Sequence, residues 1–105
     1  MRKEIAYTRA YAKPELSART LRMAMLYDSA CGFFRYHTVT DYTEKSHLGS
    51  KNKYGAVMIE VDGRPYPAAH LAILYTKGFW PKGSIGHKDG NLANFYLRNL
   101  KVEKQ

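Results

Sequence analysis

The dipeptide Asp62-Gly63 restricts the fold of this chain more than any other pair of neighbouring residues. Asp-Gly between two extended segments is a strong signal for a two-residue hairpin turn, because both turn positions need positive φ angles. Segment 54–61 before it has the pattern of a strand, and three β-branched side chains share one of its faces: Val57, Ile59 and Val61. In the return segment, Pro65 indicates a strand that is short or lies at a sheet edge. We therefore expect an antiparallel hairpin in the middle of the chain.

Two helices are expected beside this hairpin. Ser17 is a suitable N-cap for a helix over about 17–27, because its hydroxyl can accept a hydrogen bond from a backbone N–H of the first turn. Strong helix formers over 68–77 predict a second helix, which Gly78 would end. Segments 32–37 and 84–86 have strand patterns. The expected fold is a small single α+β domain with short antiparallel hairpins and two helices.

The charge of the chain indicates a polyanionic partner. The 105 residues include 17 Lys and Arg against 9 Asp and Glu, a formal net charge of +8. Nucleic acid is the expected partner for such an excess, and an acidic protein surface or an anionic membrane is the alternative. The single cysteine, Cys31, excludes an intramolecular disulfide and a cysteine-based zinc cluster.

The sequence also contains features that relate to the cellular location of the protein. No apolar run is long enough to cross a bilayer, so no membrane partner is expected. Residues 1–14 are basic, end at Pro14 and contain no apolar segment of the kind that a secretion signal has. We expect these residues to form a basic amino-terminal arm and the protein to be cytoplasmic.

One motif near the carboxyl end carries candidate chemistry. Segment Gly86–Asn91 places His87 at the end of an expected strand and a turn rich in Gly and Asn after it, and Asn99-Leu100 follows twelve positions after the histidine. Together with segments 26–35 and 54–66, this order of motifs resembles the phage HNH endonucleases, which are homing-type enzymes with a His-Me or ββα-metal finger. The likeness covers about 15–102 and implies such a finger at the carboxyl end.

The resemblance implies a role for each matching residue. His87 corresponds to the general base that activates water, and Asn99 to the residue that braces the finger loop. The family uses one divalent metal, so Mg²⁺ or Mn²⁺ would be the cofactor of an active enzyme. Such a metal stabilises the negative charge on the phosphate and on the leaving oxygen.

The chain departs from the family pattern in three places. Gly86 stands where the family has a metal ligand, and Ala69 stands where the preceding helix usually has a histidine. His70 lies one position further, about 100° around the helix. The five residues after Leu100 are too few for the last finger helix, so we expect residues 15–105 to form an HNH-like domain without that helix. Asp89 is a candidate replacement ligand, or it caps an ordinary Lys-Asp-Gly-Asn turn.

Several basic residues are candidates for contact with nucleic acid, since each phosphate that a cation neutralises adds salt-dependent affinity. They are Lys45, His47, Lys51, Lys53, Lys82, Lys88 and Arg98. The alternative for the segment 45–53 is a solvated loop whose charges only aid solubility. Trp80, Phe79 and Tyr75 could stack on bases, although their position beside Pro81 and a helix end favours packing in the core.

Two functions remain open at this point. The departures favour an HNH-derived protein that is catalytically impaired and needs no cofactor. It would act by binding DNA, or by blocking a host enzyme that handles nucleic acid, such as a polymerase or a defence nuclease. The alternative is an active nicking endonuclease that acts on DNA with Mg²⁺ or Mn²⁺.

Overall fold

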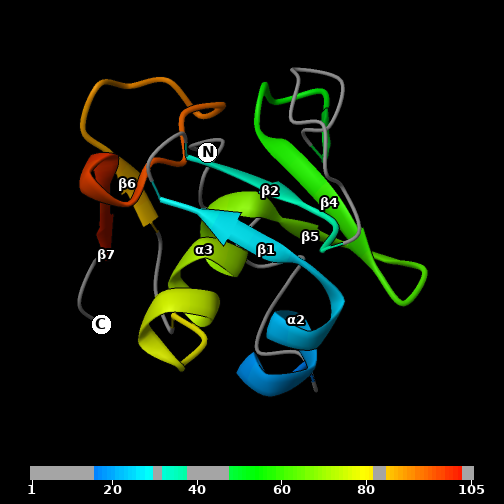
Figure 1. Cartoon of the computed structure of the whole chain (residues 1–105). Coiled ribbons are helices and arrows are strands. Elements are labelled where there is room, and N and C mark those ends of the chain that lie inside the picture. Colours follow the sequence, from blue (N-terminus) through cyan, green and yellow to red (C-terminus); the bar gives the residue numbers. More distant parts are fainter. Residues whose placement is uncertain (1–15, 30–31, 38–47, 82–84, 103–105) are drawn as a thin grey trace.

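The computed structural model describes residues 16–29, 32–37, 48–81 and 85–102. These residues form an α+β domain with two helices and antiparallel strand pairs, which confirms the expected fold class. In Figure 1, α3 (Ala68–Lys77) lies at the centre, with α2 (Ala18–Ala24) below it. Strands β4 (Val57–Val61) and β5 (Arg64–Pro67) lie to the right, and β6 (Ile85–His87) and β7 (Leu100–Val102) lie to the left. The predicted arm over 1–14 lies outside the described residues.

Helix α2 begins as expected but ends early. The Ser17 hydroxyl accepts a hydrogen bond from the Thr20 N–H at 3.1 Å, as an N-cap does. The prediction that the helix continues to about residue 27 is wrong, because Met25 is already extended, with φ at −154°. The next residues form β1 (Leu26–Asp28), which pairs antiparallel with β2 (Phe33–Arg35). In this register Tyr27 lies opposite Phe34, and both side chains are buried.

The predicted hairpin is present. Strands β4 and β5 are antiparallel, and Val61 pairs with Arg64 across a two-residue turn. Asp62 and Gly63 have φ angles of 52° and 78°, which are the positive values that this kind of turn needs. Strand β5, which contains Pro65, forms one edge of the sheet, and the short β3 (Ser50–Lys51) forms the other.

Helix α3 follows β5 directly and forms the centre of the domain. Its residues from Ala68 to Leu74 are all buried, so that elements pack around the whole of its first two turns. Gly78 ends the helix in the left-handed conformation, with φ at 83°, and its N–H donates to the Leu74 carbonyl.

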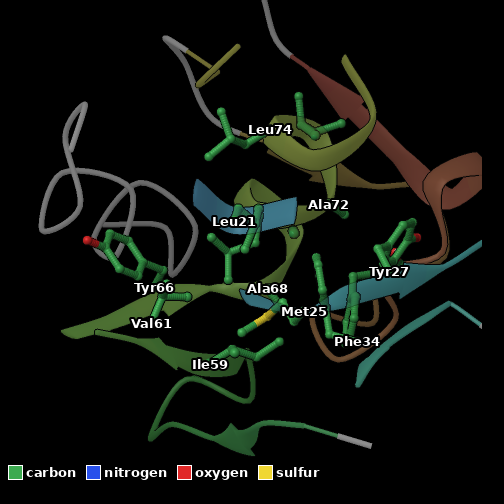
Figure 2. Close-up of a cluster of buried hydrophobic side chains, with 14 of the residues drawn as sticks. Leu21, Met25, Tyr27, Phe34, Ile59, Val61, Tyr66, Ala68, Ala72 and Leu74 are labelled. Carbon is green, nitrogen blue, oxygen red and sulfur yellow. The ribbon is translucent and has the colours of Figure 1, made fainter. Parts of the chain in front are cut away.

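The core lies where the two helices meet the strands. Figure 2 shows Leu21 of α2 and Met25, which follows this helix, beside Ala68 of α3 and Ile59 of β4. Each of these four side chains is at most 2% exposed. Full burial of one large aliphatic side chain contributes about 1.5–3 kcal/mol, so this junction is a main source of stability.

Strands β6 and β7 form a second hairpin-like unit that the core supports. The chain between them contains a short 3-10 turn, η2 (Leu97–Asn99), and a buried phenylalanine, Phe95. The Tyr27 hydroxyl donates a 2.7 Å hydrogen bond to the Phe95 carbonyl inside the core. Strand β7 was not predicted from the sequence. Neither helix among the described residues is long and apolar enough to cross a membrane.

Candidate functional site

The segment from His87 to Leu100 forms a loop that one side chain closes. The Asn99 side-chain carbonyl accepts a hydrogen bond from the Asp89 N–H at 3.1 Å. Its amide nitrogen donates to an Asp89 carboxylate oxygen at 3.0 Å and to the Asn94 carbonyl at 2.9 Å. The Asn99 backbone carbonyl also accepts from the Lys88 N–H at 2.8 Å. Asn99 thus joins both ends of the loop.

Asp89 is the acceptor at the centre of the same loop. Its carboxylate accepts hydrogen bonds from the Asn91 N–H at 2.8 Å, from the Asn94 side-chain amide at 2.7 Å and from that of Asn99. The Asn91 N–H and then the Asn94 amide hold the pKa of Asp89 below its usual value, with a smaller effect of Asn99 and an opposing effect of desolvation. Both carboxylate oxygens of Asp89 therefore accept hydrogen bonds within the loop. This matches the turn-capping alternative given for Asp89, in which it is not a metal ligand.

His87 faces the interior. On β6 the side chains of Ile85 and His87 are buried, and His87 is 8% exposed. Because side chains alternate along a strand, Gly86 lies on the other face, where its partner across the ladder is the exposed Lys101. The candidate base and the exposed face of this hairpin are thus on opposite sides of β6.

His70, which lies one position beyond Ala69, is close to His87 in the structure. It lies in the first turn of α3, is 0% exposed, and its ring centroid is 5.0 Å from that of Trp80. Burial, and secondarily the charge of protonated His87, lower the pKa of His70 to about 4. His70 is therefore neutral at pH 7. Its burial could have been anticipated from the apolar run 68–74 around it, but its proximity to His87 depends on how α3 packs against β6.

The described residues give a poor set of ligands for Mg²⁺ or Mn²⁺. These ions prefer oxygen ligands, and Gly86 supplies no side chain while the oxygens of Asp89 are engaged by the loop. Among the residues that the structure describes, no three His, Cys, Asp or Glu side chains are grouped so that they could hold a metal ion.

The predicted basic residues fall into two separate groups. Lys88 and Arg98 are exposed on the loop between β6 and β7, and Lys101, which was not predicted, is exposed on β7. Lys51 is exposed on β3, and Lys53 is exposed in the turn between β3 and β4. Three further candidates lie outside the described residues: Lys45, His47 and Lys82.

The three aromatic residues in the last turn of α3 and just after it differ in their surroundings. Trp80 is 9% exposed and packs edge-on against Tyr66, with ring centroids 6.1 Å apart. Tyr75 is half-buried and contacts Phe34 edge-on. Phe79 is 50% exposed, so packing in the core describes Trp80 and Tyr75 but not Phe79.

Comparison of the chain with protein-family models, with curated proteins and with solved structures finds no match.

Proposed function

We propose that this protein binds DNA through a scaffold of the HNH endonuclease type and that its capacity for cleavage is impaired. The observation that carries the proposal is the difference in exposure between the cationic side chains of the β6–β7 hairpin and His87. Lys88, Arg98 and Lys101 are exposed, whereas His87 is buried. Exposed cations on a braced loop suit contact with phosphates, whereas a general base must reach the water that it activates.

The charge of the whole chain supports nucleic acid as the partner. A net charge of +8 on 12.0 kDa creates a positive field that attracts polyanions and raises their association rate. Residues 85–102 contain three cationic side chains and one carboxylate, that of Asp89, so the hairpin region shares the positive sign of the chain.

The surroundings of His87 support impaired cleavage. A general base acts within about 2.6–3.2 Å of the proton donor, so its ring nitrogen must be accessible to water beside the phosphate. The His87 side chain lies on the core side of β6, and Gly86, the residue before it, contributes no ligand. Loss of general base catalysis alone typically lowers a rate by about 10²–10⁴-fold.

An active nicking endonuclease is the second candidate, and one observation favours it. His87 ends a strand, and Asn99 braces the loop that follows, which is the arrangement that the family resemblance implies for the base and the bracing residue. This candidate requires Mg²⁺ or Mn²⁺ and ligands beyond those described.

Binding is tested by fluorescence anisotropy of a labelled duplex of about 20 base pairs, titrated at several KCl concentrations. If the three exposed hairpin cations each contact a phosphate, log K falls against log salt with a slope near −2.7, or about 40-fold between about 50 and 200 mM. No binding by the parent protein at about 50 mM salt would contradict the proposal and favour a protein target, such as a host polymerase or defence nuclease.

Cleavage is tested with supercoiled plasmid and Mg²⁺ or Mn²⁺, beside a His87→Ala control. The proposal expects equal, background levels of nicked circles for both proteins. Nicking by the parent protein that the His87→Ala variant lacks would establish the endonuclease instead. Stability of the variant is checked by thermal unfolding, so that loss of the fold is not mistaken for loss of the base.

A further inference from the structure

Arg98 differs from the other exposed cations of the hairpin because an aromatic ring holds it in place. Its guanidinium carbon lies over the Tyr96 ring, 5.0 Å from the ring centroid. Stacking of this kind uses the flat face of the guanidinium and leaves the N–H groups at its edges directed outward. Arg98 is exposed, so these edges face solvent.

The Tyr96 ring also packs against the backbone of Gly32. A Cβ atom added to Gly32 would lie 2.7, 2.8 and 2.9 Å from three carbons of the Tyr96 ring, so the ring lies flat against the Gly32 backbone. Gly32 has φ at 71° in the turn between β1 and β2, and its N–H donates to the Asp28 carbonyl at 2.7 Å. Gly32 and the guanidinium of Arg98 are therefore both neighbours of this ring.

The backbone around the ring is also held at both ends. The Tyr96 N–H donates to the Asn94 side-chain carbonyl at 3.2 Å, and the Tyr96 carbonyl accepts from the Asn99 N–H at 2.9 Å. Residues 94–99 thus connect the ring to the braced loop. A long arginine side chain normally loses rotamer freedom when it binds an anion, and here much of that ordering is present before binding.

Two further cationic side chains, those of Lys88 and Lys101, belong to the same hairpin as Arg98. The Lys88 N–H donates a hydrogen bond to the Asn99 carbonyl, and Lys101 of β7 pairs with Gly86 of β6. Both are exposed. Arginine binds phosphate oxygens with two parallel N–H groups, whereas lysine acts as a point charge. The orientation of a cation therefore matters most at Arg98.

We propose that Arg98, held by its stack on Tyr96, is the phosphate-contacting anchor of a DNA-binding surface that also includes Lys88 and Lys101. Gly32 and Tyr96 are positioning residues, because they fix the guanidinium without contacting the DNA. The inference rests on the proposed binding of DNA and adds the residues that make the contact. A phosphate contact predicts affinity that does not depend on the base sequence.

The test measures the salt dependence of duplex binding for Arg98→Ala beside a matched control, Arg64→Ala. Arg64 is also exposed, but it begins β5 at the far hairpin, and both changes remove one positive charge. Loss of one phosphate contact reduces the slope by about 0.9 and weakens binding about 8-fold at 0.1 M salt. We expect this for Arg98→Ala and a much smaller change for Arg64→Ala. Equal slopes and affinities for the two variants would overturn the inference while leaving DNA binding intact.

Variants of Tyr96 test positioning separately from charge. Tyr96→Leu keeps every cation but removes the ring, so we expect weaker binding. Tyr96→Phe keeps the ring and should restore the affinity of the parent protein. Full affinity for Tyr96→Leu, in a protein whose melting temperature shows it to be folded, would contradict the positioning role. If the parent protein binds no duplex, both this inference and the proposed function fail.

Discussion

Replacing Asn99 with alanine removes three hydrogen bonds from the loop between β6 and β7. Two of them involve backbone groups, the Asp89 N–H at 3.1 Å and the Asn94 carbonyl at 2.9 Å, and the third involves the exposed Asp89 carboxylate. Asn99 itself is 8% exposed, and its backbone also joins the loop to Lys88. The substitution therefore opens the loop at the point where its two ends meet.

The expected loss of stability follows from the two backbone groups. Each net hydrogen bond contributes about 1 kcal/mol, so the free energy of unfolding should fall by about 2 kcal/mol. The contact with the exposed carboxylate is screened by water and is left out of this figure. For a domain of this size, a loss of 2 kcal/mol corresponds to a melting temperature lower by roughly 8–16 °C.

Urea unfolding followed by fluorescence measures this loss. Trp80 is the only tryptophan and is 9% exposed, so its emission reports the packing around α3. Asn91→Ala is the matched control, because Asn91 is exposed and its side chain accepts only one local hydrogen bond in the described structure, from the Ala93 N–H at 3.0 Å. We expect the control to change stability by less than about 0.5 kcal/mol. A loss for Asn99→Ala no larger than that of the control would refute the bracing role.

Three further predictions concern the core that supports the hairpin. The pKa of His70 is about 4 in the folded protein against 6.5 ordinarily, so the stability that neutral His70 contributes is complete above pH 6.5 and is lost as pH falls toward 4. This loss amounts to about 3 kcal/mol, and urea midpoints measured across that range should fall less in His70→Gln; parallel curves would contradict the assignment. Gly32→Ala should destabilise more than Gly63→Ala. Both glycines have positive φ, which costs an alanine about 1–2 kcal/mol, but only the Cβ at position 32 meets the Tyr96 ring. Equal melting temperatures for these two variants would argue against that packing. Tyr27→Phe should lower stability by about 1–2 kcal/mol, because the buried Phe95 carbonyl loses its donor. Tyr36→Phe, at a side chain that is 51% exposed, should be near neutral, and an equal effect of the two changes in thermal unfolding would count against the buried hydrogen bond.

The elements that the sequence predicted well are those whose signals are local. Asp62-Gly63 specifies its turn through the φ angles of two residues, and Gly78 ends α3 through its own left-handed conformation. The boundary of α2 was wrong because it depends on a distant partner. Met25 is extended because the residues after it pair with β2, and no pattern within 17–27 reveals that pairing. Strand β7 was missed for the same reason, since its partner β6 lies thirteen or more residues earlier in the chain.

The candidate site likewise combines features that depend on local sequence with features that depend on distant partners. Lys88, Asp89 and Asn99 lie together in the unit of β6 and β7, and the expectation that Asn99 braces this loop came from the family resemblance. The proximity of His70 to His87, and the packing of Tyr96 against Gly32, could not be predicted from the sequence. Both depend on contacts between segments separated by many residues, and such contacts are set by packing of the core.

Because side chains alternate along β6, the residue at position 86 lies on the same face of the hairpin as Lys101 and can change the charge beside it. Gly86 and Lys101 are partners on the exposed side of the hairpin, whereas His87 and Leu100 are partners on the buried side. A phosphate bound by Lys101 would therefore lie across the strand from the His87 imidazole, beyond the reach of a general base. A carboxylate at position 86 would face Lys101 directly, where it would offset the positive charge that attracts a phosphate. Under the proposed function, glycine at this position removes a metal ligand and at the same time leaves the charge of Lys101 available to DNA.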